Sequence, residues 1–130
     1  MFMKTVIHSN EAPNPIGPYS QAVKAGSMLY LSGQIALDPQ TGLMIQDSIE
    51  QETTQVMSNI KAILVAAGVD FEAIVKTSIF LSDMKLFGAV NQVYEHYFES
   101  NFPARETVQV AGLPKNANVE ISVIAITNEP

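Results

Sequence analysis

The chain has 130 residues, a formal net charge of −6 and no cysteine; 47% of its residues are hydrophobic and 15% are charged. This length predicts one domain, residues 1–130, and the composition excludes a disordered chain, disulfides and cysteine-based zinc sites. The acidic balance makes nucleic acid an unlikely partner, because binding to phosphates depends on Lys and Arg. With no membrane-length apolar run and no signal-peptide pattern at the N-terminus, we expect a cytoplasmic protein without a membrane partner.

The first third of the chain predicts three short strands. Residues 4–8 (KTVIH) are rich in β-branched side chains, and residues 9–18 are a loop with three prolines. Residues 20–24 and 28–32 flank Ala25-Gly26-Ser27, which indicates a hairpin.

A helix is predicted over residues 47–68. Asp47 and Glu50 have the spacing of a capping box, and Gly68 is a natural stop at the C-terminal end. One face of this helix is apolar; it comprises Ile49, Val56, Ile60, Ile63, Leu64 and Ala67.

The second half predicts a strand at 73–81, a second helix, and strands at 106–110 and 119–126. Asp83 is the expected cap of the second helix, whose apolar face comprises Phe87, Val90, Tyr94, Tyr97 and Phe98. Two helices on one face of a mixed β-sheet bury both apolar faces most simply, so we expect an α+β fold.

Arg105, the single arginine of the chain, follows Phe102-Pro103-Ala104 and precedes a strand-like run. Its rigid fork of donors matches a carboxylate. The alternative for Arg105 is an ordinary surface ion pair, which contributes little.

Glu120 lies in VEISVIAI, the most apolar stretch of the protein. Alternation places Val119, Ile121, Val123 and Ala125 on one face, and Glu120 on the other. Desolvation there would raise the pKa of Glu120 and make it a usable base. The alternative is a carboxylate at the wetter end of that face.

Other polar candidates have equally plain alternatives. Tyr19 and Ser20 follow a Gly-Pro turn, and Ser32 and Gly33 end a strand, where glycine lets a ligand approach the backbone. Ser32 is alternatively a turn former, and Asn91 a solvated helix residue. The two histidines, His8 and His96, are isolated, so no metal site is predicted.

Five segments in order, IGPYSQAV, LYLSGQIALDPQTG, FGAVNQVYEHYF, FPARETVQVAGLP and VEISVIAI, resemble the Rid (YjgF-type) family of reactive intermediate deaminases. The resemblance runs from about residue 7 to residue 126. It implies a chorismate-mutase-like α+β fold and a homotrimer with clefts between subunits. It also implies hydrolysis of 2-imino acids, such as 2-iminobutanoate and 2-iminopropanoate, to 2-keto acids and ammonia without a cofactor. These imines derive from enamines that pyridoxal-phosphate dehydratases release.

The resemblance also implies roles for individual residues. Arg105 would hold the substrate carboxylate, and Glu120 would activate the attacking water. Substrate binding would further involve Tyr19, Ser32, Gly33, Asn91 and Thr107. Thr107 departs from the family pattern, since well-known deaminase members carry cysteine there, so the pocket shape and substrate range of this chain can differ.

Two other functions remain open at the level of sequence. One is a non-catalytic binder of small 2-keto acids, which needs Arg105 but no activating carboxylate. The other is a translation-inhibiting endoribonuclease-like protein, as some relatives have been described, which the charge balance disfavours.

Overall fold

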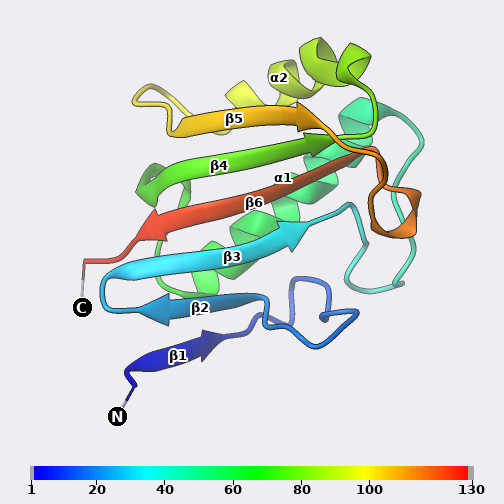
Figure 1. Cartoon of the computed structure of the whole chain (residues 1–130). Coiled ribbons are helices and arrows are strands. Elements are labelled where there is room, and N and C mark those ends of the chain that lie inside the picture. The colour runs from blue at the N-terminus through cyan, green and yellow to red at the C-terminus, as the bar shows by residue number, and fades with distance from the viewer. Residues whose placement is uncertain (1, 129–130) are drawn as a thin grey trace.

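The computed structural model describes residues 2–128, so the ends of the expected domain, residues 1 and 129–130, lie outside it. One six-stranded sheet has the order β1-β2-β3-β6-β4-β5 (Figure 1). All neighbouring strands are antiparallel except β4 and β5, which are parallel. The strands are β1 (Lys4–Ile7), β2 (Ala22–Ala25), β3 (Met28–Gln34), β4 (Ile74–Leu81), β5 (Ala104–Gln109) and β6 (Val119–Ile126).

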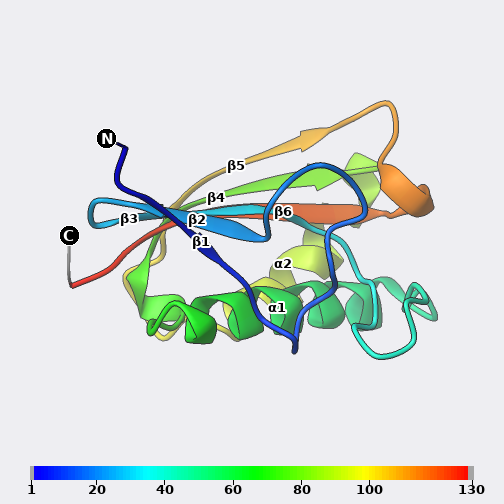
Figure 2. The same cartoon turned by 90° about the horizontal axis from the view of Figure 1, so that it is seen from below.

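Both helices, α1 (Ile49–Ala66) and α2 (Phe87–Glu95), cover the same face of the sheet, and the opposite face carries no helix (Figure 2). This arrangement confirms the expected α+β fold. Three short 3-10 helices span Phe71–Ala73, Met84–Leu86 and Pro114–Asn116. Among residues 2–128, no helix is long and apolar enough to cross a membrane.

The core lies between the sheet and the two helices, and the alternation of β6 decides which side chains enter it. Val119, Ile121, Val123 and Ala125 are all at most 2% exposed and face the helices, as predicted. The expected apolar face of α1 also packs into this core, with Val56, Ile60, Ile63 and Leu64 fully buried. The remaining face of β6, which includes Glu120, is therefore on the side of the sheet without helices.

Helix α1 begins one residue later than the capping box predicted. Ser48 is the N-cap: its backbone is extended, and its Oγ accepts a hydrogen bond from the backbone N–H of Gln51 at 3.1 Å. The prediction of Asp47 as the N-cap was therefore wrong. Serine and aspartate are about equally good N-cap residues, so the sequence alone did not distinguish Ser48 from Asp47. The predicted stop is confirmed, because Gly68 has φ +82°, which favours glycine.

Helix α2 is shorter than its aromatic periodicity predicted. Asp83 caps the 3-10 helix at Met84–Leu86, with its side chain accepting from the N–H of Lys85, and α2 follows directly. Tyr97 and Phe98 lie beyond the end of α2, in turns whose N–H groups bond three residues back, to Tyr94 and Glu95. These turns continue the aromatic face, so Tyr97 and Phe98 still pack on the core.

Phe87 was wrongly predicted as part of that core face, since it is 40% exposed.

Strand β5 begins earlier than expected, so Arg105 is the second residue of a strand rather than a residue before it. Parallel pairing with β4 places Arg105 beside Thr77 and Thr107 beside Ile79. Because Thr77 and Ile79 face the helices, Arg105 and Thr107 face them too.

Candidate active site

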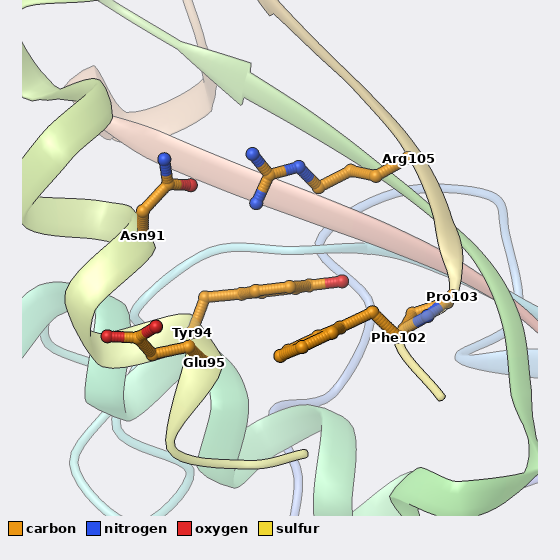
Figure 3. Close-up of a pocket in the computed structure, with 6 residues that line it drawn as sticks. All are labelled: Asn91, Tyr94, Glu95, Phe102, Pro103 and Arg105. Atoms are coloured by element: carbon orange, nitrogen blue, oxygen red, sulfur yellow. The ribbon is translucent and has the colours of Figure 1, made fainter. Parts of the chain in front are cut away.

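Arg105 extends from the edge strand β5 toward α2 (Figure 3). Its Cζ lies 5.1 Å from the ring centroid of Tyr94 and 5.6 Å from that of Phe87. Both distances are within the range in which a guanidinium is attracted by an aromatic face. The guanidinium is thus held beside two aromatic rings at the side of the sheet that carries the helices.

The Arg105 guanidinium makes no ion pair with any carboxylate among residues 2–128; the ion pair found there joins Lys76 to Glu106 at 3.2 Å. The surface ion pair considered as the alternative for Arg105 is therefore absent from this part of the chain. The donors of Arg105 border an open pocket of about 300 Å³, whose walls are Asn91, Tyr94, Glu95, Phe102 and Pro103. Asn91 points its carboxamide toward Arg105 (Figure 3), so this pocket offers an unpaired cation and an amide to an incoming anion.

Tyr94 is buried, and its hydroxyl is 2.8 Å from Oγ1 of Thr77, which is 1% exposed. Burial raises the pKa of Tyr94, although the hydrogen bond with Thr77 and the charge of Arg105 act in the opposite direction. The phenol therefore stays neutral under Arg105 at physiological pH.

Thr107 lies two residues along β5 from Arg105 and on the same face. Its Oγ1 is buried and has no hydrogen-bond partner within residues 2–128. A buried hydroxyl without a partner is unusual in a native structure. The Thr107 hydroxyl is thus a polar group next to the Arg105 pocket that could form its hydrogen bond with a bound molecule or a second chain.

Glu120 lies on β6, on the face of the sheet without helices, and is paired with Phe80 of β4. Burial raises the pKa of its carboxyl above the ordinary value, which confirms the direction expected from sequence. Its side chain lies against Gly33: a Cβ at Gly33 would overlap the carboxylate and come within 2.8 Å of Cδ. The missing side chain at Gly33 thus leaves room for the Glu120 side chain. The sequence did not indicate this role for Gly33.

Tyr19 belongs to the loop between β1 and β2, whereas Ser32 lies within β3, next to Gly33. The Ser32 hydroxyl donates to the carbonyl of Ser20 at 2.6 Å, and the Tyr19 hydroxyl accepts from the N–H of Ile16 at 3.2 Å. Ser32 therefore fastens the end of this loop to β3. Because β3 continues to Gln34, Ser32 neither ends the strand nor forms a turn, although the sequence had suggested these roles. The loop itself folds around the buried Gln21, which bonds Ser9 and Pro13.

The candidate residues form two groups rather than one site. The Arg105 group is Arg105, Asn91, Tyr94, Phe87, Phe102 and Thr107. The Glu120 group is Glu120 and Gly33, with Ser32 next to Gly33 in β3; Tyr19, in the loop between β1 and β2, bonds Ile16 instead.

Arg105 and Glu120 are on opposite faces of the sheet, with β4 between their strands. Their partners on β4, Thr77 and Phe80, are three residues apart, so strand geometry puts the two Cα atoms about 14 Å apart. A substrate of a few ångströms cannot contact both side chains of one chain.

Sequence reasoning missed three residues of the Arg105 group. Tyr94 and Phe87 were assigned to the core, and Phe102 was noted only as part of a motif. One signal was available, because Tyr94 is three residues after Asn91, and residues at this spacing share a helix face. Nothing local indicated that Phe102 would border the pocket. Within residues 2–128, no cluster of three or more potential metal-ligating side chains occurs.

Comparison with known proteins places this chain in a family. A family model described as Endoribonuclease L-PSP matches residues 9–127. A human protein named 2-iminobutanoate/2-iminopropanoate deaminase is 46% identical over 124 residues, which cover 95% of this chain and 90% of the human one.

Two solved structures are also similar to this chain. A Yersinia pestis protein of the conserved Rid family has 48% identity and a TM-score of 0.93, covering 95% of this chain and 99% of its own. E. coli TdcF with bound serine has 40% identity and a TM-score of 0.91, with the same coverage. The chain therefore belongs to the Rid (YjgF-type) family.

Proposed function

We propose that this protein is a deaminase that hydrolyses small 2-imino acids, such as 2-iminobutanoate and 2-iminopropanoate, to 2-keto acids and ammonia. The observation that carries the proposal is the guanidinium of Arg105, which makes no ion pair within residues 2–128 and is held over Tyr94 at the edge of an open pocket. The human relative named for this activity supports it, as does the serine in TdcF, a small amino acid.

In the proposed reaction, Arg105 binds the substrate carboxylate with paired hydrogen bonds. A protonated imine is already electrophilic, so the enzyme needs orientation and a placed water rather than a strong nucleophile. Glu120 takes a proton from the water molecule while the water oxygen bonds to C2 of the iminium, which gives a carbinolamine. Glu120 passes the proton to nitrogen and then takes the hydroxyl proton of the carbinolamine as the C–N bond breaks, which releases the 2-keto acid and ammonia. Ammonia accepts this proton from Glu120 and leaves as ammonium.

The separation of Arg105 and Glu120 requires a second copy of the chain. We propose that sites form between subunits of a homotrimer, with the Arg105 group of one copy facing the Glu120 group of the next. Large apolar side chains on the sheet face without helices support such assembly, since Tyr30, Val108 and Ile126 are 46%, 41% and 45% exposed.

The test is a coupled assay. Threonine dehydratase generates 2-iminobutanoate in the presence of semicarbazide, which competes to trap the imine. We expect the wild type to lower semicarbazone formation, and Arg105→Ala to lower kcat/KM about 100-fold or more, because a charge-assisted bidentate contact is lost. Lys61→Ala, which removes an exposed positive charge outside the Arg105 pocket, is the matched control and should keep full activity.

The rival function is a binder of small 2-keto acids without turnover, which the serine-bound relative also favours. Glu120→Gln separates the two. In an enzyme it keeps 2-oxobutanoate binding and loses turnover. Wild-type protein that binds 2-oxobutanoate but never lowers semicarbazone formation, from threonine or serine, would leave only the binder.

A further inference from the structure

The Arg105 guanidinium must be held in place by something other than a counter-ion. Among residues 2–128 it makes no ion pair, although ordering an arginine side chain costs rotamer entropy. Its nearest described contacts are the two rings, and that of Tyr94 is the closer.

Tyr94 is well suited to be this support because it is itself buried and held by two contacts. Its side chain is 4% exposed, and Phe98 packs against it with ring centroids 4.9 Å apart. The Tyr94 hydroxyl bonds the buried hydroxyl of Thr77. Thr77 in turn pairs with Arg105 across β4 and β5.

These contacts form a closed circuit of three residues. Arg105 pairs with Thr77 in the sheet, the Thr77 hydroxyl bonds the Tyr94 hydroxyl, and the Tyr94 ring lies beside the Arg105 guanidinium. The ring is thus fixed relative to the backbone of the residue whose cation it supports. Phe87, the second ring, is 40% exposed, so it is less restrained than the buried Tyr94.

We propose that Tyr94, anchored by Thr77, is a positioning residue that holds the Arg105 guanidinium ready for a small carboxylate before the carboxylate arrives. The inference rests on the proposed function for its ligand class. A ring can do this where a carboxylate cannot, since an acidic partner would occupy the same donors as the substrate. The neutral phenol leaves those donors free.

Preorganisation affects binding more than the chemical step, which gives the proposal a specific signature. For Tyr94→Leu, we expect the dissociation constant for 2-oxobutanoate and KM to rise about fivefold or more, while kcat changes less than twofold. Tyr94→Phe keeps the ring and should weaken binding less than Tyr94→Leu does.

The control is Tyr97→Leu, the same change in the same segment. Tyr97 packs on Phe71 at 5.1 Å and does not line the Arg105 pocket, so its loss should leave ligand affinity unaltered. If Tyr94→Leu does not fold, Tyr94→Met is used in its place, because methionine is also apolar and has a long side chain without a ring.

A second readout needs no ligand. Arg105 is the single arginine, so its Nε–H gives one assigned NMR signal. We expect a positive heteronuclear NOE in the wild type and in Tyr94→Phe, and its loss in Tyr94→Leu but not in Tyr97→Leu.

An unchanged NOE in folded Tyr94→Leu overturns the inference, as does equal weakening of 2-oxobutanoate binding by Tyr94→Leu and Tyr97→Leu. If the wild type neither binds 2-oxobutanoate nor lowers semicarbazone formation, the proposed function fails. The NOE still decides whether Tyr94 positions Arg105.

Discussion

Glu120 combines a partly buried carboxyl with a position against the backbone of Gly33. Because burial raises its pKa, the folded protein binds this proton more tightly than the unfolded chain does. The free energy of unfolding should therefore fall as pH rises from the ordinary carboxyl value of 4.5 through the raised pKa.

Urea denaturation across this pH window measures the effect, and Glu120→Gln should remove this part of the slope. Glu99→Gln, which neutralises an exposed glutamate after α2, is the control and should keep the slope. If Glu120 is the base, the acid limb of the kcat/KM profile also lies above 4.5. A slope that persists in Glu120→Gln would assign it to other groups.

The hydroxyl of Thr107 is buried and lacks a hydrogen-bond partner within residues 2–128. Thr107→Val removes a buried, unpaired polar group and should raise the free energy of unfolding by about 1 kcal/mol. Thr53→Val is the matched control, because the Thr53 hydroxyl donates to the carbonyl of Ile49 at 2.8 Å, and it should destabilise.

Chemical denaturation of both variants gives the comparison. Equal destabilisation by Thr107→Val and Thr53→Val would mean that the Thr107 hydroxyl has a partner in the assembled protein, such as a neighbouring subunit.

At the scale of elements, a buried carboxylate on α1 ties the sheet to the helix layer. Glu52 is 1% exposed and accepts hydrogen bonds from the N–H and side-chain amide of Asn118, at 2.7 and 2.9 Å. Asn118 also bonds Ser82 through its side chain and backbone. This network joins α1 to the start of β6, two residues before Glu120, and to the end of β4.

Glu52→Ala should lower the free energy of unfolding by about 2–4 kcal/mol, because two donors of Asn118 lose their acceptor in a buried place. Glu50→Ala, at an exposed position two residues earlier on α1, should lower the free energy of unfolding much less. Urea denaturation measures both. Equal losses would show that helix content, rather than the Asn118 contact, accounts for the effect.

At the scale of the whole molecule, the two groups of candidate residues predict complementation between inactive variants. Arg105→Ala and Glu120→Gln should each be inactive alone. After unfolding, mixing in equal amounts and refolding, about a quarter of the sites in a cyclic trimer pair an intact Arg105 with an intact Glu120 from the next copy.

We expect about a quarter of wild-type activity in the semicarbazide assay for the mixture, and none for either variant refolded alone. Light scattering should give the mass of three chains for every sample. A monomer, or a trimer that recovers no activity, would contradict sites shared between subunits.

Local patterns in the sequence determined much of the architecture. The alternation of residues 119–126 identified β6 and both of its faces, and the periodicity around Val56 and Ile60 identified the buried face of α1. These predictions succeeded because each depends on neighbouring residues that share one element. Sequence also singled out Arg105 and Glu120, through the isolation of one and the apolar surroundings of the other.

Only the tertiary structure decided how those residues lie relative to one another. The insertion of β6 between β3 and β4, and the parallel pairing of β4 with β5, join segments far apart in the chain. That pairing directs Arg105 toward the helices and onto Tyr94, while Glu120 faces away beside Gly33. Strand order depends on which apolar faces pack together across the whole chain, and no local pattern of residues encodes it.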